Sequence, residues 1–151
     1  MEKIQLFMGV ICLSAFFITI LIQIFSRYFG ISVIWTEEVA NYSFIWSVFM
    51  GASVMLHRKG HFKFNLLLLK LEGKAKIFLN LVINTILLIF SSLVLYYGVI
   101  ATRSFWYYRW VALPDLQMGY VFLCLPIMGL TMGTYVLSHM TDQIKEWKGG
   151  N

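Results

Sequence analysis

Two adjacent acids, Glu37 and Glu38, follow Trp35 and Thr36 at the start of an apolar run, in a chain with only 7 acidic residues. A carboxylate at the edge of a hydrocarbon layer needs water, a cation or a helix end. The pair could therefore hold a cation, stabilise the start of a helix or contact a partner. Which of these applies depends on the elements that position it.

The histidines are the other candidates for chemistry. His57 and His61 are four residues apart and His139 ends another apolar run, a pattern that raises the possibility of a metal ion or haem. All three lie at the ends of apolar runs, whereas a membrane haem usually needs facing histidines inside a bundle. We therefore favour a structural or headgroup-contact role and expect no cofactor. Cys12 and Cys124 lie within apolar runs and are interpreted as small buried hydrophobic side chains.

Other catalytic and transport motifs are missing from the sequence. It contains no Gly-rich phosphate loop, no CxxC pair and no series of carboxylates inside an apolar run. An independent ion transporter would also be expected to carry ionisable sites near the bilayer midplane, usually in two related halves. We predict that the chain is not an enzyme and that it is one component of a larger assembly.

The composition indicates whether the chain folds in water or in a membrane. With 60% hydrophobic and 13% charged residues, the chain is a membrane protein. Continuous apolar runs of roughly 20 residues are typical of membrane helices, whereas barrel strands alternate apolar and polar residues. We predict an all-α fold, a single transmembrane domain over residues 1–151 with a retained first span. The four predicted helices cover residues 4–26, 36–56, 77–102 and 118–138.

The positive charges predict the orientation. Most Lys and Arg residues lie between the second and third spans or near the termini, and an even number of spans puts these on one side. Positively charged short loops remain cytoplasmic, so both termini are expected inside and the connections after the first and third spans outside. The net charge of +5 is thus a topology signal, and no nucleic-acid partner is needed to explain it.

The loop between the second and third spans has two possible interpretations. Its segment 62–74 interleaves leucines with lysines, as in an amphipathic helix lying in the membrane interface. It can equally be an ordinary basic loop that packs under the bundle. In both cases membrane lipid is an expected partner. The candidate headgroup contacts are Arg58, Lys59, His61, Lys63, Lys70, Lys74 and Lys76.

Small and amide side chains are the candidates for helix association, because lipid provides no hydrophobic drive for it. Three pairs stand at helical spacing: Ser47 with Gly51, Gly129 with Gly133, and Asn80 with Asn84. Pro126 is expected to bend the fourth span, and the carbonyl that it frees then needs a neighbouring donor or water.

The acidic pair has a structural and a functional interpretation. Thr36 is a suitable N-cap, and acids in the first helical turn are favoured by the helix dipole by roughly 0.3–1 kcal/mol. Alternatively, one glutamate approaches Arg27 across the short hairpin. Adjacent helical positions point about 100° apart, so the other glutamate would face a neighbouring subunit.

Several segments together resemble a known family. These are residues 23–28 (QIFSRY), 35–38 (WTEE), 44–46 (FIW), 51–52 (GA), 58–61 (RKGH) and 120–127 (YVFLCLPI). In this order they resemble the small membrane subunit of tripartite ATP-independent periplasmic (TRAP) transporters, over nearly the whole chain. The chain looks somewhat closer to the sialic-acid branch than to the C4-dicarboxylate branch.

The resemblance implies a sodium-coupled secondary transporter of bacterial inner membranes. In such systems a periplasmic binding protein delivers an organic acid and a large membrane subunit moves it, while the small subunit acts as a fixed scaffold. Candidate contacts with the large subunit are Arg27, Trp35, Glu37, Glu38, Trp46, Ser47 and Gly51. Candidate contacts with the periplasmic partner are Arg103, Arg109 and Asp115, in a connection that could equally be only an aromatic membrane belt.

Two other classes of protein are alternatives. A four-helix anchor of a redox complex, carrying haem or quinone, would be recognised by its colour and by its partner. A small self-assembling multidrug exporter is disfavoured because such proteins carry a membrane-embedded acid in the first span, and residues 4–26 contain none.

Overall fold

The computed structural model describes residues 2–58 and 74–149. These residues form α1 (Glu2–Tyr28), α2 (Trp35–His57), α4 (Lys74–Ser104), the short α5 (Gly119–Phe122) and α6 (Cys124–Gly149). Four helical stretches in the described ranges are long and apolar enough to cross a membrane: Glu2–Tyr28, Trp35–His57, Leu79–Ser104 and Gly119–Thr141. The predicted all-α fold with four spans is confirmed.

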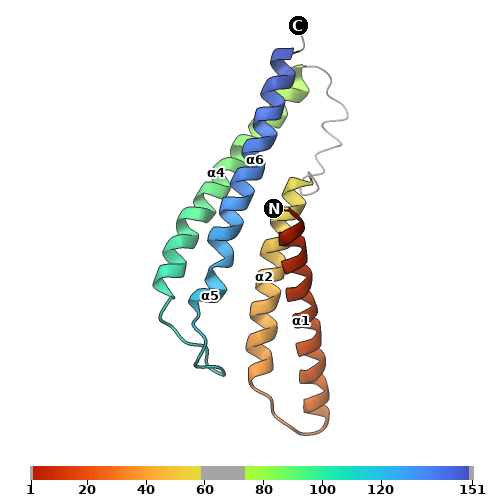
Figure 1. Cartoon of the computed structure of the whole chain (residues 1–151), viewed down its shortest axis with the longest axis vertical. Helices are drawn as coiled ribbons and strands as arrows, with labels where there is room; N and C mark the ends of the chain where they lie inside the picture. Colours follow the sequence, from red (N-terminus) through yellow and green to blue (C-terminus); the bar gives the residue numbers. More distant parts are fainter. Residues whose placement is uncertain (1, 59–73, 150–151) are drawn as a thin grey trace.

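The helices form two antiparallel pairs. Helix α1 packs along α2, α4 packs along α6, and α2 meets α6 between the pairs. The connections 29–34 and 105–118 lie at the same end of the molecule, which we call the hairpin end (Figure 1). The opposite end, where α2 finishes and α4 begins, is called the loop end. The predicted interfacial segment 62–74 falls almost wholly outside the described residues.

The core lies where α2 meets α6. Leu56, Met128, Met132, Tyr135 and Val136 are buried together there. Large apolar side chains are exposed along α1 and the outer faces of α4, as expected of helices whose surroundings are hydrocarbon rather than water.

The fourth span is interrupted near Pro126, the residue at which the sequence predicts a bend. The helix breaks at Leu123 between α5 and α6. A proline cannot donate a backbone hydrogen bond, so the carbonyl of Phe122 lacks its helical donor. The Thr102 hydroxyl of α4 lies 3.1 Å from this oxygen and 2.7 Å from the Gly98 carbonyl oxygen. The neighbour that the sequence demanded is therefore Thr102.

Glycines set the approach of α4 to α6. A Cβ on Gly129 would lie 2.6 Å from the backbone nitrogen of Leu95, and one on Gly98 would lie 2.9 Å from the nitrogen of Pro126. Gly133 has only an ordinary contact, 3.5 Å from Ser91 Oγ. Of the predicted pair, Gly129 therefore makes the close contact, and Gly98 is its unpredicted counterpart.

Candidate functional site

The acidic pair lies in the first turn of α2, but Thr36 is not its cap. The helix begins at Trp35, and Thr36 is completely buried within the first turn. Its hydroxyl donates a hydrogen bond to the Val33 carbonyl oxygen at 2.7 Å. The N-cap prediction was wrong because the helix begins one residue before Thr36, and a hydroxyl within a helical turn bonds back to a preceding carbonyl.

Glu38 joins the two helix pairs at the hairpin end. Its Oε1 accepts from the backbone N–H of Val111 and its Oε2 from that of Ala112, each at 2.8 Å. Both donors belong to the connection between α4 and α5. A carboxylate that accepts two backbone N–H bonds is held more strongly than a neutral acceptor would be. Glu38 therefore links α2 to the 105–118 connection and is not a free acid available to a partner.

Arg27 does not pair with either glutamate. In the part of the chain that the structure describes, the ion pairs involve only Glu2, His57 and Arg58. Arg27 and Glu37 are exposed and instead line one open hollow of about 360 Å³ at the hairpin end. Arg27 stands in the last turn of α1, where the helix dipole favours a cation. The predicted internal pair was wrong because Glu38 turns toward the 105–118 connection.

The 105–118 connection is fixed by its own hydrogen bonds. Arg109 Nη1 donates to the Pro114 carbonyl oxygen at 2.9 Å, and Arg109 forms an isolated antiparallel bridge with Gln117. The Trp110 ring packs edge-on against Tyr42 of α2 at 4.4 Å between centroids. Asp115 is exposed. The connection is thus a folded cover on the start of α2.

A second group of interactions joins the helices at the loop end. Glu2 Oε1 accepts from Arg58 Nε at 2.7 Å, and Glu2 Oε2 lies 3.4 Å from His57 Nε2. The His57 ring stacks on Tyr135 at 4.4 Å, and His139 Nε2 lies 3.1 Å from the His57 carbonyl oxygen. Arg58, a predicted headgroup contact, is bonded to Glu2 of α1 and its side chain remains 55% exposed. His57 and His139 thus both contact protein groups, while their structural or headgroup-contact role stays a prediction.

Buried polar side chains continue these interactions from the loop end toward the middle of the bundle. Gln5 Nε2 donates to Thr131 Oγ1 at 2.9 Å, the Tyr135 hydroxyl donates to Gln5 Oε1 at 2.8 Å, and Thr131 Oγ1 lies 3.4 Å from Ser53 Oγ. We call these four residues the inner polar network. It joins α1, α2 and α6. The sequence pattern did not predict it, although Gln5, one of two glutamines in the predicted first span, was an available signal.

The described residues do not bring metal-binding side chains together. The described ranges contain no group of three or more His, Cys, Asp or Glu side chains placed to hold a metal ion. The two described histidines are directed at protein groups. Lys59, His61, Lys63 and Lys70 lie outside the described residues, and Lys74 and Lys76 are described only as part of the backbone of α4.

Comparison with known families identifies the chain. The sequence model of the family described as "Tripartite ATP-independent periplasmic transporters, DctQ component" matches residues 16–146. The chain belongs to this family. A comparison with individual curated proteins yielded no match.

The DctQ match covers the described spans except for residues 2–15, the first half of α1. This DctQ-family protein is the small membrane subunit of a TRAP transporter, a multi-pass protein of the bacterial inner membrane. The family is one of transporter subunits and not of enzymes. The match favours transport over the redox-anchor alternative.

The remaining interface candidates of this DctQ-family subunit lie in different surroundings. Trp46 Nε1 donates to the Tyr120 carbonyl oxygen at 3.2 Å, so this side chain contributes to the contact between α2 and α5. Gly51 has nothing within 4 Å of a Cβ built on it, so no helix of the described chain occupies the space beside it. Ser47, one turn earlier, is partly exposed, as is Trp35.

Proposed function

We propose that this subunit is the stationary scaffold of a sodium-coupled TRAP transporter that imports an organic acid, either a sialic acid or a C4-dicarboxylate. A periplasmic binding protein would deliver the substrate, and the large membrane subunit would bind and move it. One observation carries the proposal. The two helix pairs are tied to each other at both ends, by Glu38 with the 105–118 connection and by the inner polar network.

A part that stays still while another slides through the membrane must resist distortion. Polar ties at opposite ends of packed helices supply that resistance, because both ends would have to break before the pairs could separate. The stretches 4–26, 39–56, 77–102 and 118–138 also carry no Asp, Glu, Lys or Arg. A subunit without charge near the midplane is suited to support a transport path rather than to form one.

The orientation that we propose has both termini in the cytoplasm. It is supported by Arg58 and the lysines of residues 59–76, which would lie inside together with Lys3 and Lys145. The hairpin end then faces the periplasm. Arg109 and Asp115, both exposed there, are the proposed contacts with the binding protein.

The proposed surface for the large subunit lies on α1 and α2. Gly51 leaves open space beside α2, and small side chains permit close helix approach in a membrane. At the hairpin end of the same pair, Arg27 and Glu37 offer a cation and an acid on either side of one hollow. Since Glu38 is occupied internally, Glu37 becomes the proposed partner-facing carboxylate.

The test is co-purification and uptake. We expect the double variant Arg27→Ala/Glu37→Ala to retain about fivefold less large subunit than the unmodified chain, since each surface charge contributes up to about 1 kcal/mol. Uptake of labelled sialic acid, or of a labelled C4-dicarboxylate, into vesicles should fall in parallel and should require a sodium gradient. Lys3→Ala, an exposed cation at the other end of α1, is the matched control.

Full co-purification and full uptake by the double variant would exclude Arg27 and Glu37 as contacts with the large subunit. Uptake that is independent of a sodium gradient would exclude the sodium coupling. If neither acid is transported, both proposed substrate classes are wrong while the assignment to the family stands.

A further inference from the structure

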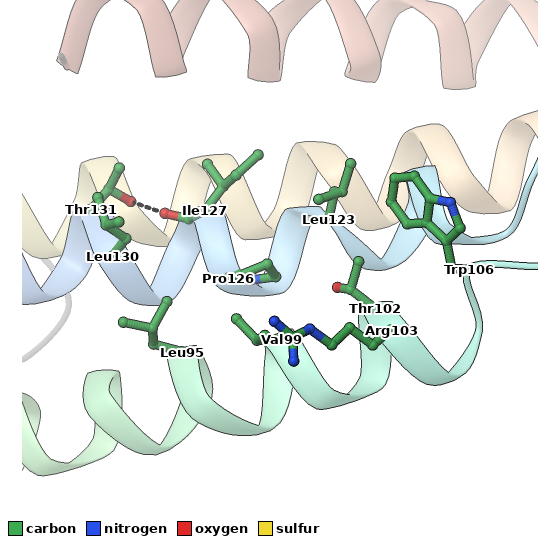
Figure 2. Close-up of a pocket in the computed structure, with 10 residues that line it drawn as sticks. All are labelled: Leu95, Val99, Thr102, Arg103, Trp106, Leu123, Pro126, Ile127, Leu130 and Thr131. Atoms are coloured by element: carbon green, nitrogen blue, oxygen red, sulfur yellow. Dashed lines mark hydrogen bonds between the residues drawn. The ribbon is translucent and has the colours of Figure 1, made fainter.

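An apolar groove runs between α4 and α6 toward the hairpin end. It has a volume of about 510 Å³. Its lining includes Leu95, Val99, Arg103 and Trp106 along and just after α4, and Ile127 and Leu130 of α6, which Figure 2 shows on facing helices. Ile127 and Leu130 are exposed in the chain itself, so the groove opens toward the surroundings of the helices.

A second groove lies on α4 beside the first. It has a volume of about 530 Å³ and is lined by Ser92, Leu95, Tyr96, Val99, Ile100 and Arg103. Leu95, Val99 and Arg103 therefore belong to both grooves. The two apolar grooves thus share one cationic side chain.

Arg103 is the unusual member of this lining. In Figure 2 its side chain runs back along α4 toward Val99 instead of extending away from the apolar residues. Within the described ranges it makes no ion pair and no side-chain hydrogen bond. A guanidinium beside hydrocarbon is costly unless an anion satisfies it. The Arg103 guanidinium therefore needs an anion, and the described chain does not provide one.

Trp106 is the side chain at this site that is suited to the membrane surface. A Cβ on Gly119 would lie 2.6 Å from the Trp106 ring, so the indole is packed closely on the start of α5. Indole rings prefer the headgroup region. Trp106 and Arg103 lie one turn apart at the end of the grooves, where a lipid headgroup meets its acyl chains.

We infer that the two grooves bind one diacyl phospholipid of the leaflet at the hairpin end. Its phosphate would bind Arg103, and its acyl chains would lie in the groove between α4 and α6 and in the groove on α4. The phosphate supplies the missing anion, with charge-assisted hydrogen bonds from the guanidinium. Two apolar grooves that meet at one cation match a ligand with two acyl chains and one charged headgroup. This inference is independent of the substrate and of the scaffold role.

The experiment counts lipids bound to the full chain, extracted in a mild non-ionic detergent together with the subunits that accompany it. Native mass spectrometry follows a titration with dioleoyl-phosphatidylglycerol. A parallel titration uses dioleoylglycerol, which has the same two chains but no phosphate. We expect Arg103→Gln to weaken phosphatidylglycerol binding about fivefold, from the contribution of one basic side chain near a lipid surface.

Two further variants separate the site from general effects. Val99→Trp fills the shared wall of both grooves and leaves the charge, so it should also lose the bound lipid. Lys3→Gln removes one positive charge at the opposite end and should bind lipid like the unmodified chain. The inference is overturned if Arg103→Gln or Val99→Trp binds normally, or if Lys3→Gln loses as much. It is also overturned if dioleoylglycerol binds as well as the phospholipid, or if the unmodified chain binds none.

Discussion

Glu38 illustrates how one side chain can organise an end of a membrane bundle. Its two carboxylate oxygens each accept a backbone N–H from the 105–118 connection. Both donors lie in an irregular segment, so the carboxylate supplies hydrogen bonds that a helix or sheet would otherwise provide. Its sequence neighbour Glu37 is exposed and lines the hollow beside Arg27. Adjacent acids thus have separate roles because they lie on different sides of α2.

The first prediction concerns this residue. Glu38→Ala removes both hydrogen bonds and leaves two backbone donors to solvent, so we expect the free energy of unfolding to fall by about 1–3 kcal/mol. Thermal unfolding in detergent, followed by tryptophan fluorescence, measures the change. Glu37→Ala is the matched control and should be nearly neutral. Equal losses from both variants would show that the two hydrogen bonds do not stabilise the bundle.

At the scale of the helices, packing is closest where side chains are absent. Gly129 faces the backbone of Leu95, and Gly98 faces Pro126. Close approach also lets the Thr102 hydroxyl reach the carbonyl that Pro126 leaves without a helical donor. The break in the fourth span and the glycine in the third are therefore parts of one contact.

The second prediction tests that contact. A methyl group at position 129 would overlap the Leu95 backbone, which cannot rotate away, so Gly129→Ala should lower the free energy of unfolding by about 1–3 kcal/mol. Gly133→Ala introduces the same methyl group one turn later, where the nearest atom is at 3.5 Å. It should be tolerated. Thermal unfolding of both variants provides the comparison, and equal stability would contradict the close packing.

The third prediction concerns the inner polar network between α1 and α6. A double-mutant cycle with Gln5→Leu and Tyr135→Phe should give a coupling energy of about 0.6–1.7 kcal/mol, the range found for hydrogen bonds between membrane helices. Chemical unfolding of the four proteins measures it. Tyr135→Phe keeps the ring that stacks on His57, so the cycle isolates the hydroxyl. A coupling energy near zero would contradict the bond between Gln5 and Tyr135.

At the scale of the molecule, the two helix pairs behave as one tied body. The ties at the hairpin end and the loop end are independent, since they use different residues of α2. Between them, Trp46 bonds to the start of α5. Such an arrangement is consistent with the proposed stationary role.

The fourth prediction tests this rigidity during transport. The His57 and His139 rings lie 5.8 Å apart between α2 and α6, so cysteines at these positions can be joined by a short cleavable bis-maleimide. Cys12 and Cys124 would first be replaced by Ala. We expect the cross-linked subunit to support full vesicle uptake, because a scaffold does not need its helix pairs to separate. Loss of uptake that returns on cleavage of the linker would show that they do move.

The sequence by itself determined the membrane environment, the four spans and the family resemblance. These depend on local properties: an apolar run longer than the hydrocarbon thickness must be a helix whatever its neighbours are. It also showed that a carbonyl near Pro126 needs another donor, because a proline lacks an N–H regardless of context.

Only the tertiary structure decided the partners of the polar side chains. Which way Glu38 points, which hydroxyl reaches Phe122 and which residues Gln5 meets depend on the rotation of each helix about its axis and on its contacts with helices distant in sequence. Such rotations are set by the packing of the whole bundle, through contacts such as those of Gly98 and Gly129. The acidic pair was therefore visible in the sequence as an unusual feature. Only the fold showed that Glu38 bonds to the 105–118 connection while Glu37 is exposed.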